Sequence, residues 1–181
     1  LFKTVSKKST YKNVGDIMLG FSILMVGMQG MSGAVSGLKD NAHFVNMLTM
    51  FSNPVMGILV GILFTAVLQS ASASIGILQA LSVTGAISFA TAFPITMGIG
   101  VGAACPVLLS SIGTNKNGKR TALIYLMNDL FGMLFWSITF YLVNAIVHFE
   151  FLDMTMTPVT IAMLNTVFRL ATVIILFPFI K

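Results

Sequence analysis

The stretch that decides the fold is residues 53–85, NPVMGILVGILFTAVLQSASASIGILQALSVTG. As one continuous helix, its roughly 33 residues would extend about 50 Å, well beyond a hydrocarbon core of about 30 Å. Two complete spans would need about 40 residues, so the stretch is too short for them. Its middle, Gln69–Ser74, is small and polar. The sequence therefore predicts a re-entrant hairpin, in which two half-length helices joined by a polar turn enter and leave the membrane on one side.

The composition of the whole chain is typical of a membrane protein. Hydrophobic residues make up 56% of the 181 residues, charged residues only 8%, and the mean hydropathy is +0.95. A soluble domain carries about 25% charged residues, so this chain has too few to cover a surface in water. The single cysteine, Cys105, excludes a disulfide scaffold, and basic clusters between apolar runs argue against nucleic acid as a partner. Beyond the hairpin, four segments are suited to span the bilayer: 14–38, 89–112, 122–147 and 159–180.

The distribution of charge predicts how these segments are oriented. Cytoplasmic loops are enriched in lysine and arginine. With the basic residues of 3–12 inside, four spans and one hairpin place the basic loop 116–120 inside and the acidic Glu150 and Asp153 outside. A single crossing by 53–85 would place that basic loop outside, so the charges also favour the hairpin. We therefore expect a cytoplasmic linker at 1–13, joined to a segment upstream, and one transmembrane domain at 14–181 in the plasma membrane.

Two smaller features are predicted around the hairpin. A short helix at the outer interface is expected over 43–51, with Pro54 in the first turn of the first half-helix, where its missing N–H costs nothing. A second irregular segment is expected in the run that contains Gly98, Gly100 and Gly102, because glycine weakens a helix and lets backbones approach closely. Gly98 and Gly100 are therefore candidate positions beside a substrate or an ion, with close helix packing as the alternative.

The polar turn contains the main candidate ligands, Gln69, Ser70, Ser72 and Ser74. Their amide and hydroxyl groups would lie beside the unpaired backbone N–H groups at the start of the second half-helix. Such a helix start attracts anions, while the carbonyl groups that end the first half-helix suit Na⁺, and secondary transporters use broken helices in this way. The alternative is that these small residues only permit close packing of helices.

Two opposite charges lie near the middle of predicted spans. Asp129 follows Arg120 by nine residues, about 13 Å of helix, and Arg169 precedes Lys181 by twelve residues, about 18 Å. An unpaired charge at this depth costs at least about 2.5–3.5 kcal/mol. We expect the two side chains to form a buried ion pair or to lie on the ion pathway, with Asn128 and Asn165 as supporting residues. No nucleophile–base pair is recognisable, so neither an enzyme activity nor a cofactor is expected.

Several motifs along the chain are similar to those of one family. Residues 65–88, TAVLQSASASIGILQALSVTGAIS, resemble a QSSSA signature, and residues 98–120, GIGVGAACPVLLSSIGTNKNGKR, resemble a G-x-N-I-G-T-T segment with the loop behind it. Residues 125–132, YLMNDLFG, and 165–179, NTVFRLATVIILFPF, resemble two helices with the patterns H-L-x-F-N-x-x-G and H-T-x-F-N…L-P-F. Residues 20–35 resemble the glycine-rich opening helix of a repeat. Together they resemble the sodium-dependent phosphate cotransporter family.

The resemblance implies one half of an inverted-repeat transporter. Family members have two inverted repeats, each with one such hairpin, and the resemblance implies that phosphate and Na⁺ bind between the two turns. This chain contains one such motif, so the other half is expected in a longer parent chain or in a second copy. The implied activity is symport of phosphate, with Na⁺ as the coupling ion. Several departures from the family pattern leave two alternatives, symport of another small anion or a non-transporting scaffold or regulatory subunit; they are Ala71, Gly100, Ala103, Ala104, Tyr125, Asp129, Asn165 and Arg169.

Overall fold

The protein is a bundle of apolar helices, as predicted. The computed structural model describes residues 9–37, 41, 43, 46 and 50–179, and within them there is no strand, only one isolated bridge between Ser88 and Thr155. The elements are α2 (Ser9–Val35), α4 (Pro54–Leu68), α5 (Ala71–Ser82), α6 (Phe89–Gly102), α7 (Ala104–Ser111), α8 (Lys116–Val147), η2 (Glu150–Asp153), α9 (Pro158–Leu176) and η3 (Phe177–Phe179). Four helical segments are long and apolar enough to cross a membrane: Lys12–Ala34, Phe89–Ser111, Lys116–Val147 and Pro158–Leu176.

Two of these helices begin earlier than the sequence predicts. Helix α2 begins at Ser9, inside the predicted linker, and α8 begins at Lys116 instead of residue 122. The early start of α8 follows from its cap, because the Oδ1 of Asn115 accepts the N–H of Gly118 at 2.9 Å. Residues 1–8 of the predicted linker and most of the predicted interfacial helix at 43–51 lie outside the described residues.

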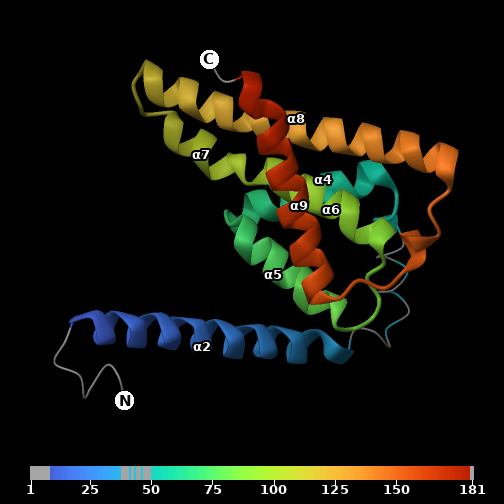
Figure 1. Ribbon diagram of the computed structural model, residues 1–181, viewed down its shortest axis with the longest axis horizontal. Helices are drawn as coiled ribbons and strands as arrows, with labels where there is room; N and C mark the ends of the chain where they lie inside the picture. The colour runs from blue at the N-terminus through green and yellow to red at the C-terminus, as the bar shows by residue number, and fades with distance from the viewer. Residues whose placement is uncertain (1–8, 38–40, 42, 44–45, 47–49, 180–181) are drawn as a thin grey trace.

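The stretch 53–85 forms two short helices separated by a turn. Helix α4 begins with Pro54, and the Oδ1 of Asn53 caps it by accepting the N–H of Val55 at 3.0 Å. It ends at Leu68, and α5 begins at Ala71. In Figure 1 the chain changes direction between α4 and α5, so the two do not form one rod. Entry and exit on the same side of a membrane stay a prediction.

The centre of the molecule is the crossing of α4 and α6, which pack more extensively than any other pair among the described helices. Small residues make this approach possible. A Cβ atom added at Gly61 would collide with the carbonyl of Ile95, and one added at Gly98 would collide with the carbonyl of Ile58. Gly102 likewise lies against Thr65. The backbones of α4 and α6 approach through small residues spaced four apart, a pattern that membrane helices use for close packing. The other helices then pack around this pair.

The other helices surround this crossing (Figure 1). Helix α8 packs against both α6 and α7, and α5 lies between α2 and α9. The best-buried large side chains, Phe93, Ile87, Ile99 and Ile161, come from α6, the segment before it and the start of α9. A polar contact also joins α5 to α9, because the Nε2 of Gln79 donates to the carbonyl of Pro158 at 3.0 Å. Helix α9 is thereby positioned against both α5 and α6.

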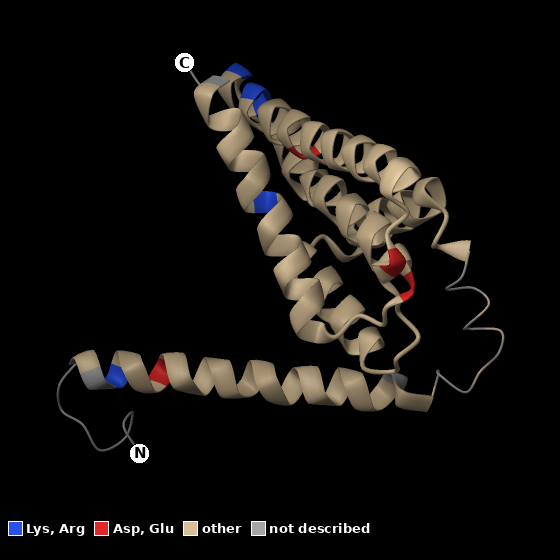
Figure 2. Ribbon diagram, turned by 45° about the vertical axis from the view of Figure 1, so that its right-hand side comes forward, with Lys and Arg blue, Asp and Glu red and all other residues tan. Residues whose placement is uncertain are grey.

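Charged residues gather at opposite ends of the bundle. The first turns of α8 contain Lys116, Lys119 and Arg120, whereas η2 beyond its other end contains Glu150 and Asp153. In Figure 2 the basic start of α8 lies at the top of the view, and the acidic η2 lies beyond the other end of that helix. The predicted topology requires this arrangement. Which end faces the cytoplasm stays a prediction.

Candidate functional site

The break between α4 and α5 is made by two residues with different conformations. Gln69 has a left-handed backbone, with φ 55° and ψ 23°, and its N–H donates to the carbonyl of Thr65 at 2.8 Å. Ser70 is extended and caps α5, since its Oγ accepts the N–H of Ala73 at 3.2 Å. A left-handed residue ends one helix and an extended serine starts the next, so the polar sequence produces the turn locally.

The four predicted polar ligands of this turn do not share one environment. Gln69 and Ser72 are exposed, and the hydroxyls of Ser70 and Ser72 lie 3.2 Å apart. Ser74 is fully buried; its Oγ donates to the carbonyl of Ser70 at 3.0 Å and accepts from the Oγ1 of Thr65 at 3.0 Å. Ser74 therefore connects α4 to α5, while Gln69, Ser70 and Ser72 are the residues left open to a ligand.

The glycine-rich segment is interrupted for a single residue. Helix α6 ends at Gly102 and α7 begins at Ala104, while Ala103 between them keeps helical angles, φ −64° and ψ −20°. The interruption is thus smaller than the irregular segment that the sequence suggests. The two candidate glycines lie on different faces of α6: Gly98 packs against Ile58 of α4, and Gly100 lines a pocket on the opposite side.

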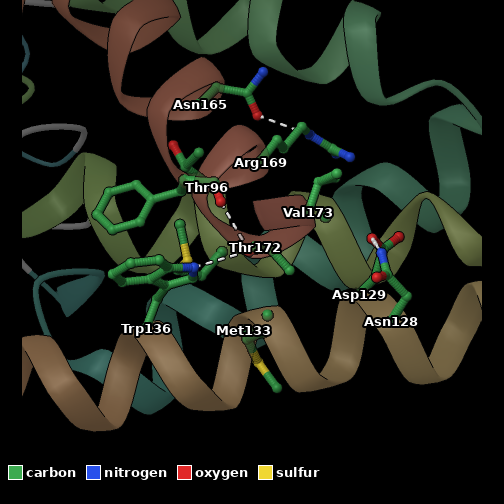
Figure 3. A pocket seen from close by; sticks show the side chains of 13 residues that line it. Thr96, Asn128, Asp129, Met133, Trp136, Asn165, Arg169, Thr172 and Val173 are labelled. Carbon is green, nitrogen blue, oxygen red and sulfur yellow. Dashed lines mark hydrogen bonds between the residues drawn. The ribbon is translucent and has the colours of Figure 1, made fainter. Parts of the chain in front are cut away.

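That pocket lies between α6, α8 and α9 and has a volume of about 100 Å³ (Figure 3). It brings together five of the residues predicted from sequence, namely Gly100, Asn128, Asp129, Asn165 and Arg169. None of the turn residues 69–74 lines it, so the turn and the pocket are two separate polar regions of the described structure.

Asp129 and Arg169 line the same pocket, but no ion pair joins these two described side chains. The Nε of Arg169 donates to the Oδ1 of Asn165 at 3.2 Å, one turn earlier on α9. The Oδ1 of Asp129 accepts from the Nδ2 of Asn128 at 3.4 Å, and its Oδ2 is buried without a hydrogen-bond partner. In place of the predicted buried pair, the two charges flank a shared space, with Asp129 half-buried and Arg169 exposed.

Three polar residues of the pocket were not predicted from sequence. Thr96 is 4% exposed, and its Oγ1 has no hydrogen-bond partner. The Nε1 of Trp136 donates to the Oγ1 of Thr172 at 2.8 Å. Helical spacing was the available signal, because Thr96 precedes Gly100 by four residues, Trp136 follows Asp129 by seven and Thr172 follows Arg169 by three. Each therefore shares a helix face with a residue that the sequence did single out.

Comparison with known proteins identifies relatives over most of the chain. The family described as Na⁺/Pi-cotransporter matches residues 36–163. Sodium-dependent phosphate transport protein 2A of Rattus norvegicus is 33% identical over 131 residues, which cover 65% of this chain and 20% of the relative. Sodium-dependent phosphate transport protein 2B of Homo sapiens is 27% identical over 124 residues, which cover 65% of this chain and 18% of that protein. The protein YqeW of Bacillus subtilis is 24% identical over 125 residues, 67% of this chain and 40% of that protein.

The aligned part corresponds to about a fifth of the length of the mammalian relatives. No solved structure matches the chain. The family match covers the hairpin, the glycine-rich helix and α8, which are the elements that build the turn and two walls of the pocket. The chain belongs to the Na⁺/Pi-cotransporter family.

Proposed function

We propose that this chain forms one half of a sodium-coupled phosphate symporter in the plasma membrane, and that the Gln69–Ser72 turn contacts phosphate or Na⁺. Family membership supports the activity, as do the mammalian relatives whose names describe sodium-dependent phosphate transport. The observation that carries the location is the turn itself. It places the exposed side chains of Gln69 and Ser72 and the hydroxyl pair of Ser70 and Ser72 at the start of α5.

The chemistry of the turn suits a small oxyanion. Hydroxyl and amide groups donate hydrogen bonds to phosphate oxygens, and the start of α5 adds partial positive charge and backbone N–H groups. Serine and amide oxygens, with the carbonyls that end α4, are the hard ligands that an alkali cation prefers. One turn offers only part of a coordination shell, so a second half, in the parent chain or in a second copy, would complete the site.

The proposed cycle couples two gradients to one movement. Na⁺ binding orders the turn, phosphate docks on its hydroxyl and N–H groups, and the loaded site is then exposed to the other side. Each net positive charge that crosses gains about 2.3 kcal/mol per 100 mV of membrane potential. The Na⁺ gradient adds to this, so uptake of the anion against its own gradient becomes possible.

Uptake of ³²P-phosphate into proteoliposomes that contain the full-length protein tests the proposal. We expect Na⁺-dependent uptake by the unaltered protein and its loss in Gln69→Ala and in Ser72→Ala. Both side chains are exposed, so neither change should disturb membrane insertion. Ser110→Ala on α7 is the matched control, because this exposed serine bonds only locally, to the carbonyl of Val107. Unchanged uptake in both turn variants would reject the assignment of the turn.

The same assay separates the alternatives. A protein that inserts and folds but moves no anion along a Na⁺ gradient would be the scaffold or regulatory subunit. Uptake of another labelled oxyanion with no uptake of phosphate would identify a symporter of different specificity. The motivation for both alternatives lies at Gly100, Ala103 and Ala104, where side chains without oxygen replace the asparagine and threonines of the family pattern.

A further inference from the structure

The pocket between α6, α8 and α9 contains buried polar groups that the protein itself leaves unsatisfied. Among the described residues, three buried side-chain atoms lack a hydrogen-bond partner, and two of them, Oδ2 of Asp129 and Oγ1 of Thr96, belong to residues that line this pocket. Thr96, on α6, is 96% buried. Buried polar groups are nearly always hydrogen-bonded, so two unpaired ones in one cavity indicate that the cavity holds a polar occupant.

The size and charge of the pocket limit what that occupant can be. Its volume of about 100 Å³ exceeds the roughly 10–15 Å³ that one water needs. A bare cation would find the carboxylate of Asp129 but would be repelled by the guanidinium of Arg169, which lines the same space. An anion without a proton would find Arg169 but would be repelled by the unpaired Oδ2 of Asp129. A ligand that fits both walls accepts hydrogen bonds at one side and donates one at the other.

We propose that this pocket is a binding site for a protonated tetrahedral oxyanion, held between Arg169 and Asp129. Phosphate near neutral pH keeps at least one O–H group, which can donate to the Oδ2 of Asp129, while its other oxygens accept from the N–H groups of Arg169. Arsenate has the same pattern, whereas sulfate has no proton to donate. The site is distinct from the Gln69–Ser72 turn and does not depend on the function proposed for that turn.

The geometry around Arg169 supports this assignment. Its Nε is fixed by Asn165 at 3.2 Å, so the two terminal nitrogens of the guanidinium remain for a ligand. Nη2 comes within 4.0 Å of the place that a Cβ atom would take at Gly100, so the glycine leaves room beside it. In Figure 3 the guanidinium points toward the end of the pocket where Asn128 and Asp129 lie, away from Trp136. The N–H donors of Arg169 on α9 and the carboxylate acceptor of Asp129 on α8 thus border the same pocket.

Binding of ³²P-phosphate to the full-length protein in detergent at neutral pH tests the proposal. The measurement is made in the unaltered protein and in a Ser72→Ala background, so that binding at the turn is separated from binding at the pocket. In both, we expect unlabelled arsenate to compete and sulfate to compete poorly. Arg169→Gln should weaken phosphate binding by roughly tenfold or more, because two charge-assisted hydrogen bonds are lost.

Asp129→Asn gives the sharper test, because the proposal predicts that this variant gains the ability to bind sulfate. The amide can donate to an unprotonated oxygen, so we expect sulfate to become an effective competitor in this variant. A misfolded protein would not gain a ligand. Arg120→Gln at the start of α8 and Asp153→Asn in η2 make the same changes of charge outside the pocket, and both should behave like the unaltered protein.

Three results would overturn the proposal. Phosphate binding in the Ser72→Ala background that Arg169→Gln does not weaken would mean that only water bridges Arg169 and Asp129. If sulfate competes with phosphate equally well in the unaltered protein and in Asp129→Asn, the carboxylate does not recognise the proton of the ligand. Loss of ²²Na⁺ binding in Asp129→Asn, with phosphate binding unchanged, would make the pocket a cation site.

Discussion

The close approach of α4 and α6 leads to a prediction about two glycines of the same helix. In Gly98→Ala, the new Cβ atom would collide first with the carbonyl oxygen of Ile58, and it would also lie 2.9 Å from the carbonyl carbon and 3.0 Å from the Cα atom of that residue. Ordinary contacts begin near 3.4 Å and the carbonyl oxygen is the limiting contact, so the helices must separate by more than about 0.5 Å at the crossing. A gap of about 0.5–1 Å already loses a quarter to a half of the attraction between facing atoms. Because the obstacle is backbone, no rotamer change relieves it.

The expected cost follows from two opposing terms. Overpacking of a tight contact costs about 1–3 kcal/mol, and alanine recovers about 0.5–1 kcal/mol over glycine in a helix. We therefore expect Gly98→Ala to lower the unfolding free energy by about 1–2 kcal/mol, which corresponds to a fall in Tm of roughly 2–8 °C for a chain of this size. The fall in Tm is measured by heating the detergent-purified protein and quantifying the remaining folded fraction by size-exclusion chromatography.

Gly100→Ala is the control on the same helix. Its Cβ atom would meet only the Nη2 of Arg169, at 4.0 Å, so its Tm should equal or exceed that of the unaltered protein. If Gly98→Ala melts at or above Gly100→Ala, the α4–α6 crossing is not the rigid contact described above, and the packing argument fails.

Two further predictions concern hydrogen bonds that connect helices. Ser74→Ala should lower the unfolding free energy by about 1–2 kcal/mol, because it removes the buried hydrogen bond from Thr65 at 3.0 Å. Ser72→Ala is the control and should leave Tm unchanged. Equal Tm values for the two variants would contradict the division of the turn into a buried and an open serine. Trp136→Phe should cost about 1 kcal/mol because the 2.8 Å bond to Thr172 is lost, and a Tm within error of the unaltered protein would show that this bond contributes nothing.

The sequence predicts the parts of the fold that depend on segment length. The break near Gln69 follows from comparing a stretch of about 33 residues with the thickness of a bilayer, and Pro54 marks a helix start by its chemistry alone. Both features are found in the structure. The start of α8 at Lys116 was missed, because hydropathy marks where a helix can enter lipid and Asn115 marks where the helix begins.

The faces of the helices were harder to predict. In a soluble helix, polar residues mark the outer face, but here both the lipid side and the core side are apolar, so composition does not say which side is buried. Gly98 and Gly100 look alike in the sequence, yet one packs against α4 and the other lines the pocket. Ser72 and Ser74 differ in the same way. Such differences depend on which neighbour each face meets, which only the three-dimensional arrangement provides.

Helical rise predicts a similar membrane depth for Asp129 and Arg169, which stays a prediction, and the two residues do line one pocket. Their direct pairing was not a safe inference, because depth along two helices says nothing about the direction of the side chains. Asn165 takes the Nε of Arg169, and the pocket separates the charges.

The hydrogen bond from Gln79 to Pro158 has a mechanical consequence. Gln79 lies seven residues after Ser72, two turns further along α5, and Pro158 opens the helix that carries Arg169. Sliding α5 along its axis must either drag the first turn of α9 with it or break this 3.0 Å bond. The turn at 69–74 and the pocket share no lining residue, and α5 with this one hydrogen bond connects the turn to the helix that carries Arg169.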